Sequence, residues 1–234
     1  MNRLLALATF AAAILFAASP FFTSGFKGFE GNQFPVPQID PAVQPAGYAF
    51  SIWGPIYLWL IAGTGFGLFR RADAITWTSS RPALFISLAI GATWIAVAQI
   101  SVIWATVQIW LMLIAALAAF VRASDDDAWW QREPIGIYAG WLTAASSVSV
   151  GLVLAGYGYT TQDIAAYVSL SIALIIAVAM QKACPKSLSY PIAVIWALVG
   201  IVVSNLEPLN TSVVALCAVG IGYLLIGLIK ARNN

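Results

Sequence analysis

Long, unbroken blocks of apolar residues determine what this 234-residue chain can fold into. In lipid every backbone polar group must be paired, so such a block crosses a membrane as a helix. A barrel strand would instead alternate apolar and polar residues. Each crossing helix needs about 20 apolar residues. The sequence therefore predicts an all-α integral membrane protein with eight helices, at residues 4–23, 48–69, 83–102, 105–121, 135–156, 163–181, 190–205 and 211–229.

The composition supports this class of protein and excludes several others. Hydrophobic residues make up 61% of the chain and charged residues 9%, whereas a soluble domain has about 25% charged residues. No basic cluster suggests a nucleic-acid partner. The chain has no histidine, which removes histidine-ligated haem, histidine bases and histidine metal sites. Cys184 and Cys217 fall at different depths of the predicted topology, so we expect two free thiols.

Two helix boundaries need interpretation. The third and fourth blocks run together through "AQISVIWATVQIW", where no charge, glycine or proline marks a turn. We place the turn near 102–106, because the joined block is too long for one crossing. The first block follows Arg3 and ends near "FAAS", as a signal peptide could. Its apolar stretch is longer than the 7–15 residues usual for a signal peptide, so we interpret it as a crossing helix.

Lysine and arginine predict the orientation, because basic residues collect on the cytoplasmic side of membrane proteins. With a cytoplasmic N-terminus, eight crossings leave Lys27 as the one basic residue outside. The other ten of the eleven basic residues fall inside: Arg3, Arg70, Arg71, Arg81, Arg122, Arg132, Lys182, Lys186, Lys230 and Arg232. We therefore expect a multi-pass protein of the bacterial inner membrane with both termini in the cytoplasm.

The longest segment between blocks is 24–47, "SGFKGFEGNQFPVPQIDPAVQPAG". Its glycines and prolines prevent a continuous helix. It also carries Phe26, Phe29 and Phe34, which a disordered linker would not favour. We expect an ordered external cap; the alternative is an interfacial loop whose rings insert among lipid headgroups.

Residues typical of catalysis are scarce. No block has a charged residue in its middle, although buried charge usually marks proton relays and ion paths. Asp163 and Glu207 lie at predicted helix ends. The segment "SDDDAWW" at 124–130 is interpreted as a cytoplasmic loop, since adjacent carboxylates on a loop rarely converge on a cation. We predict no catalytic residue and no metal ligand, and hence a protein that is not an enzyme.

Small residues recur at helical spacing and predict close helix packing. Gly63 and Gly67 have GxxxG spacing in the second block. A longer stripe runs along the fifth block through Gly136, Gly140, Ala144, Ser147, Gly151 and Ala155. We favour packing within the chain, and a homodimer seam is the alternative.

Aromatic residues form the most specific pattern. Phe50, Trp53 and Tyr57 have the spacing i, i+3, i+7 and lie on one helical face. Trp94 falls in the third block, and Tyr138 and Trp141 fall in the fifth. An interfacial belt accounts for the remaining candidates, Trp59, Trp77, Trp129 and Trp130. Aromatic walls with few polar groups suit a flat apolar ligand.

The second block resembles the TspO family, the translocator proteins or tryptophan-rich sensory proteins. In that family a Pro-rich loop leads into the second helix with Pro, then Trp eight residues later, then Tyr four further on. Pro45, Trp53 and Tyr57 reproduce this spacing. The family's Phe precedes the Trp by four residues, whereas Phe50 precedes it by three.

The third and fifth blocks resemble the family less closely. Trp94 matches the Trp of an Asn-x-x-Trp motif, with Gly91 in place of the Asn. Pro134, Tyr138 and Trp141 match the fifth helix, with Ser149 in place of a later Asn. Gln99, Thr93 and Ser149 are candidates to replace the lost amide contacts.

The resemblance implies a fold, a site and a ligand. It covers 1–157 and implies a five-helix bundle whose loop 24–47 covers a pocket, with 158–234 supplying three additional transmembrane helices. The family binds porphyrins and sterol-like molecules, and in phototrophic bacteria it is tied to control of pigment production. The implied ligand site comprises Pro45, Phe50, Trp53, Tyr57, Trp94, Gln99, Tyr138, Trp141 and Ser149.

Three functions remain open from the sequence. The first is a sensor, carrier or regulator that binds a tetrapyrrole as ligand and needs no cofactor, with membrane lipid and a hydrophobic small molecule as partners. The second is a structural or assembly subunit of a larger membrane complex, such as a photosynthetic pigment complex. The third is a transporter, which would need a polar path or broken helices that the blocks do not show.

Overall fold

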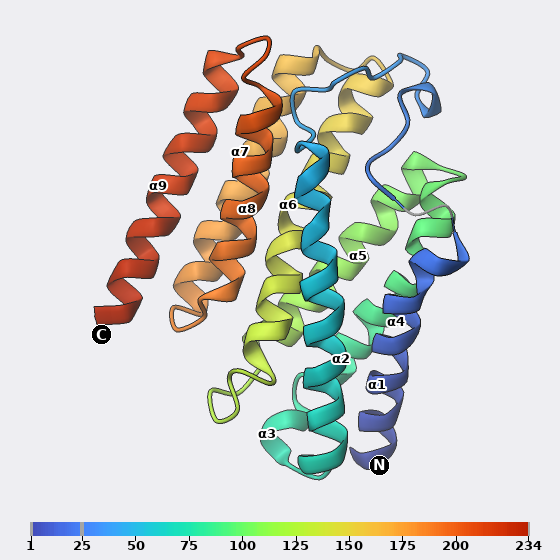
Figure 1. Cartoon of the computed structure of the whole chain (residues 1–234), viewed down its shortest axis with the longest axis vertical. Coiled ribbons are helices and arrows are strands. Elements are labelled where there is room, and N and C mark those ends of the chain that lie inside the picture. Colours follow the sequence, from blue (N-terminus) through green and yellow to red (C-terminus); the bar gives the residue numbers. More distant parts are fainter. Residues whose placement is uncertain (1, 24–25, 234) are drawn as a thin grey trace.

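The computed structural model describes residues 2–23 and 26–233, so the first two residues of the predicted loop 24–47 lie outside the described residues. The described chain is an all-α bundle without named strands, which confirms the predicted fold class (Figure 1). Its long helices are α1 (Asn2–Ala18), α2 (Trp53–Arg70), α4 (Arg81–Ala98), α5 (Val102–Val121), α6 (Arg132–Gly156), α7 (Gln162–Ala183), α8 (Ser189–Ser204) and α9 (Thr211–Asn233). Short elements are η1 (Ser19–Phe22), η2 (Gly31–Gln33), η3 (Gly47–Ile52) and α3 (Ile75–Thr78).

All eight predicted blocks are helices, and seven helical segments are long and apolar enough to cross a membrane. The exception is α8, which has 16 residues and is about 24 Å long at 1.5 Å per residue. The hydrocarbon core of a bilayer is about 30 Å thick. This shortfall matches the short seventh block in the sequence.

The turn between α4 and α5 lies at 99–101, earlier than the predicted 102–106. Ser101 is the N-cap of α5, and its hydroxyl accepts a hydrogen bond from the backbone N–H of Trp104 at 3.3 Å. A serine cap satisfies one of the unpaired N–H groups of a helix start. Ser101 was therefore the missing turn signal in a stretch without glycine or proline.

Helix α6 is the central helix and packs against α2, α5, α7 and α8. Its glycines make the close approaches possible. A Cβ on Gly140 would lie 2.4 Å from the carbonyl oxygen of Tyr190 in α8, and one on Gly151 would lie 3.0 Å from the Cβ of Ser169 in α7. At these positions the small-residue stripe serves packing within the chain.

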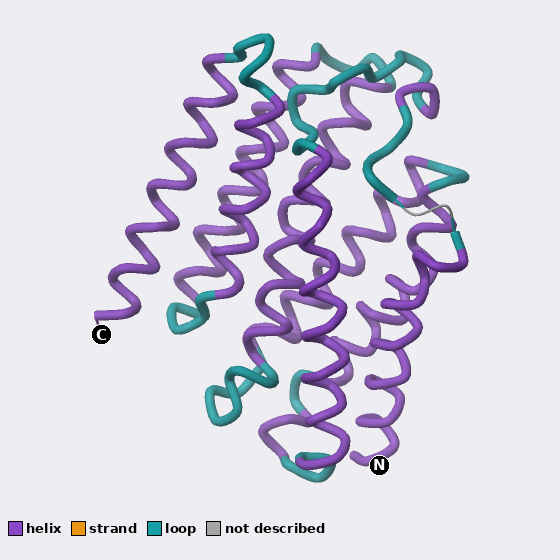
Figure 2. Tube along the Cα trace, viewed as in Figure 1, coloured by secondary structure: helices purple, strands orange, loops and turns teal. Residues whose placement is uncertain are grey.

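The helices run up and down, and both termini lie toward the same end of the bundle (Figure 1). Loops gather at the two ends (Figure 2). The linkers that carry Arg71, Arg122 and Lys186 lie at the end where the termini lie, whereas the 26–52 segment lies at the opposite end (Figures 1 and 2). This arrangement matches the predicted threading, and the assignment of the basic end to the cytoplasm stays a prediction.

Trp77 corrects the predicted interfacial belt. Its side chain is only 4% exposed, and its indole nitrogen donates a hydrogen bond to Oδ2 of Asp127 at 2.9 Å. Helix α3 folds back under the bundle, where Gly67 leaves room for the ring: a Cβ there would lie 2.5 Å from it. Trp129, in contrast, is 64% exposed as a belt residue would be.

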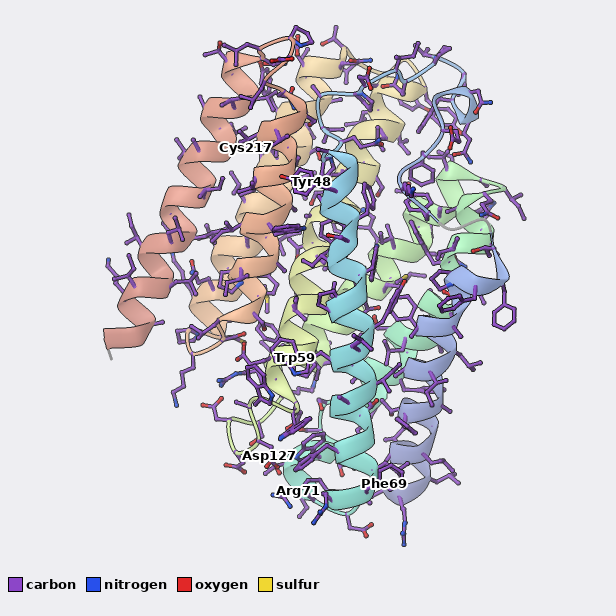
Figure 3. All side chains as sticks on the ribbon, in the orientation of Figure 1. Tyr48, Trp59, Phe69, Arg71, Asp127 and Cys217 are labelled. Carbon is purple, nitrogen blue, oxygen red and sulfur yellow. The ribbon has the colours of Figure 1, made fainter. Side chains whose placement is uncertain are left out.

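Two aspartates of the triplet at 125–127 form ion pairs. Asp127 accepts two hydrogen bonds from the Arg71 guanidinium, at 2.8 and 3.2 Å. Arg71 and Asp127 lie together at the end opposite Tyr48 (Figure 3). Asp125 pairs with Arg132 and with Lys186. Among the described residues no group of three acidic or cysteine side chains is arranged to hold a metal ion.

Candidate functional site

The predicted face of α2 forms the centre of an aromatic cluster. Trp53 and Tyr57 stack with ring centroids 5.3 Å apart and an interplanar angle of 16°. Phe16 of α1 meets both rings edge-on, at 5.0 Å from Tyr57 and 5.7 Å from Trp53. The spacing along one helix therefore places two large rings side by side, and α1 supplies a third.

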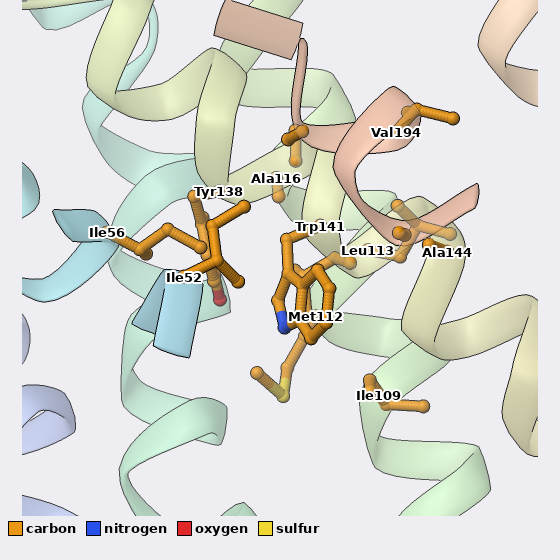
Figure 4. Packing of buried hydrophobic residues seen from close by; sticks show 14 of the residues in the cluster. Ile52, Ile56, Ile109, Met112, Leu113, Ala116, Tyr138, Trp141, Ala144 and Val194 are labelled. Atoms are coloured by element: carbon orange, nitrogen blue, oxygen red, sulfur yellow. The ribbon is translucent and has the colours of Figure 1, made fainter. Parts of the chain in front are cut away.

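Trp141 extends this cluster from the central helix. Its ring lies 5.8 Å from Phe50 and 6.1 Å from Trp53, both nearly perpendicular. Trp141 is buried among apolar side chains from several helices (Figure 4). The η3–α2 segment and helix α6, which are far apart in sequence, thus bring three of the predicted rings together.

The described part of the 24–47 segment covers the same cluster. Phe26 packs edge-on against Trp94 of α4 with centroids 4.7 Å apart, and it also contacts Phe29 and Phe50. Phe34 is buried over Gly156 at the end of α6. These contacts favour the ordered cap over rings inserted among headgroups.

A cavity of about 390 Å³ opens among these rings. Its aromatic lining comes from Phe16, Phe26, Tyr48, Phe50, Trp53, Tyr57 and Trp94. Lys27 is the one charged residue among its described lining residues. Ligand pockets usually measure about 300–1,000 Å³ and are mainly apolar with a few polar groups. This cavity has the size and chemistry of a binding site for an apolar molecule.

A smaller hollow of about 40 Å³ adjoins the cavity. The two share Phe26, Phe50, Trp94 and Ile109 as lining residues. The smaller one reaches Pro45, Trp141 and Ser149.

Helix α8 positions the segment that enters α2. The backbone N–H of Ala46 donates to the carbonyl of Gly200 at 3.0 Å. A Cβ on Gly200 would lie 2.9 Å from the Cβ of Ala49 and 3.0 Å from that of Pro45. Pro45 and the short helix η3 therefore rest directly on α8, and the prolines and glycines of this stretch allow a tight, non-α approach to the cavity.

Three polar groups near the cavity are already paired within the protein. The Tyr138 hydroxyl is hydrogen bonded to the Ser87 hydroxyl at 2.8 Å. Trp94 donates to the carbonyl of Ala105 at 2.9 Å, and Ser149 donates to the carbonyl of Ser146 at 2.7 Å. The Trp141 indole nitrogen, in contrast, is fully buried and has no hydrogen-bond acceptor among the described residues.

The predicted site residues therefore fall into four groups. Phe50, Trp53, Tyr57 and Trp94 line the cavity, and Pro45, Trp141 and Ser149 line the smaller hollow. Tyr138 is completely buried and packs against Phe16. Gln99 is exposed and lines an open outer hollow near Glu30 and Gln33.

Two candidates to replace the lost amides are less suitable than expected. Thr93 is exposed and donates to the carbonyl of Ile90 within its own helix at 2.9 Å. Ser149 also donates its hydroxyl hydrogen to a carbonyl of its own helix.

The sequence did not predict Phe16, Met112 and Lys27 as lining residues of the cavity. Of these three, only Lys27 stood out in the sequence, because it is the one basic residue predicted to lie outside the cytoplasm.

The fold and the cavity define a class: a helical integral membrane protein with an aromatic binding cavity toward one end of its bundle. The sequence profile of the family described as TSPO-like protein matches residues 2–230. The chain belongs to this family. The match runs through all eight long helices and does not stop at residue 157, where the noted resemblance ends. Comparisons with curated proteins and with solved structures gave no match.

Proposed function

We propose that this TSPO-like membrane protein binds a flat hydrophobic ligand of the tetrapyrrole class and acts as a sensor, carrier or regulator, not as an enzyme. The observation that carries the proposal is the aromatic cavity of about 390 Å³ between α1, α2 and α4. Flat rings gain from stacked and edge-on contacts with aromatic side chains. The family resemblance supplies the ligand class.

The unpaired indole nitrogen of Trp141 supports a ligand with a hydrogen-bond acceptor. A buried donor without a partner costs about 1–3 kcal/mol. An acceptor atom that reached the smaller hollow would remove this cost. Trp141 would then contribute to orientation of the ligand as well as to stacking.

Stacking and shape, without axial ligation of a metal, are expected to hold the ligand. The chain has no histidine, and its thiols are poorly placed for this cavity: Cys217 lies in α9 and Cys184 follows α7. Tyrosine is a weak metal ligand while it is protonated, with an ordinary pKa near 10. Met112 also lines the cavity, but the chain has no histidine to pair with its thioether as in Met/His-ligated haem. Binding should therefore depend little on a central metal ion.

Titration by quenching of tryptophan fluorescence tests this function. Metal-free protoporphyrin and haem should bind within about tenfold of each other, which corresponds to about 1.4 kcal/mol. A haem preference of a hundredfold, or a sharp low-spin haem spectrum, would show axial ligation and contradict the proposed binding mode. Failure of both molecules to bind, together with purification in a stoichiometric complex, would favour the structural-subunit alternative.

A further inference from the structure

Lys27 lies where two hollows meet. It lines the aromatic cavity, and it also lines an outer hollow of about 500 Å³ with Gly28, Glu30, Gln33 and Gln99. Its side chain is exposed. Among the described residues the Lys27 ammonium has no ion-pair or hydrogen-bond partner.

The position of Lys27 runs against the charge distribution of the molecule. The other ten of its eleven basic residues belong to the helix ends and linkers at the opposite end of the bundle. A basic residue on the translocated side opposes the usual orientation bias. The orientation bias therefore does not explain a lysine at this position. A role at the mouth of the cavity would explain it.

Glu30 lines the same outer hollow but forms no ion pair with Lys27 in the structure. Glu30 is the other charged residue among the described lining residues of the outer hollow. Its carboxylate accepts a hydrogen bond from the backbone N–H of Gln33 in the capping box of η2, and the Gln33 side chain in turn accepts from the Glu30 N–H at 2.9 Å. Glu30 is thus committed to a local turn, which leaves the lysine charge available.

We propose that Lys27 binds a carboxylate on the edge of the ligand. This inference rests on the proposed function and narrows the ligand class to flat apolar ring systems that carry an acidic group at one edge. The rings would occupy the aromatic cavity, where no charge needs to be buried. The carboxylate would remain in the outer hollow, where water still reaches it and the ammonium offers a charged hydrogen-bond donor.

A comparison of protoporphyrin with its dimethyl ester tests the proposal, because the ester keeps the ring and loses the charge. Both are titrated against the unaltered chain and Lys27→Gln in nanodiscs of zwitterionic lipid. We expect Lys27→Gln to weaken binding of the acid about fivefold, the upper range for an exposed ion pair. Binding of the ester should change less than twofold, and added salt should reduce the difference.

Lys182→Gln is the matched control, because Lys182 is an exposed lysine in the last turn of α7, at the opposite end of the bundle. It removes the same charge and should leave both titrations unchanged. If acid and ester bind but Lys27→Gln affects them equally, the carboxylate assignment is overturned while the proposed function stands. If neither binds the unaltered chain, the proposed function is overturned and the assignment with it.

Discussion

The indole nitrogen of Trp196 in α8 donates a hydrogen bond to the carbonyl oxygen of Ala49 at 2.8 Å. Ala49 lies in η3, one residue before Phe50 and four before Trp53. Two further bonds join the C-terminal end of α8 to the segment just before η3: Ser204 donates to the carbonyl of Gln44, and Asn205 donates to that of Ala42, each at 2.8 Å. One of the three last helices therefore holds the segment that builds the cavity.

Trp196→Phe should disturb the cavity from a distance. It keeps an aromatic ring but removes the donor to Ala49, so we expect a loss of about 1 kcal/mol of stability. Because η3 also positions Phe50 and Trp53, porphyrin affinity should fall at the same time. Thermal unfolding and fluorescence titration of one sample measure both effects. Trp104→Phe, at a 65% exposed site in α5, is the control, and an equal effect there would exclude a specific role for Trp196.

Loss of the aromatic wall should weaken ligand binding directly. Trp53→Ala and Trp141→Ala should each cost about 1–3 kcal/mol of binding free energy, the scale of a dominant aromatic contact. Trp129→Ala should have little effect, since this ring is 64% exposed. Equal losses in all three variants would indicate general destabilisation. Trp141→Phe, which retains most of the buried volume, separates the indole donor from the packing of the ring.

Glu133 should be important for stability although it lies outside the cavity. Its Oε2 atom accepts hydrogen bonds from the backbone N–H groups of Leu188 and Ser189, at 3.1 and 2.8 Å, at the start of α8. Glu133→Gln should destabilise the protein by about 1–3 kcal/mol, because bonds to a charged acceptor are strong. Circular dichroism melting in detergent measures this. Glu207→Gln, on an exposed loop, should stay within about 0.5 kcal/mol, and a similar loss there would refute a specific cap.

The Asp127 ion pair should make stability depend on pH in the acid range. The hydrogen bond from Arg71 holds the pKa of the Asp127 carboxyl below its ordinary value. A lowered pKa stabilises the folded state above the unfolded pKa of about 3.9, and the stabilisation is lost as the pH falls through the folded pKa. Asp127→Asn should lower the melting temperature at pH 7, and this difference should shrink as the pH is lowered below the unfolded pKa of about 3.9. A constant difference across this range would contradict the assignment.

The orientation can be checked with reporter fusions. We expect a fusion after residue 158 to report the outside and a fusion at the C-terminus to report the cytoplasm, because the ten-to-one distribution of basic residues places them on opposite sides. Two fusions that report the same side would rule out eight alternating crossings. The short helix α8 makes this test informative, since an α8 that failed to cross would give that result.

The sequence predicted those features that depend on local pattern. Apolar blocks gave the eight helices, and the i, i+3, i+7 spacing gave the face shared by Phe50, Trp53 and Tyr57. Contacts between distant segments could not be predicted from the sequence, because nothing near Glu133 indicates that its hydrogen-bond partners are Leu188 and Ser189. Trp77 was misplaced for the same reason, because its burial depends on Asp127, fifty residues later.

The glycines of α6 have a consequence for how the protein is made. Helix α6 leaves the ribosome before α7 and α8, so its shallow grooves at Gly140 and Gly151 first face lipid tails or the insertion machinery. The later helices must displace those tails before their backbones can seat at contact distance. The segment at Ala46 and Ala49 lacks its hydrogen-bond partners for longer, because α8 follows it by some 150 residues. We therefore expect the cavity to be completed only after α8 has been synthesised, although most of its walls are synthesised first.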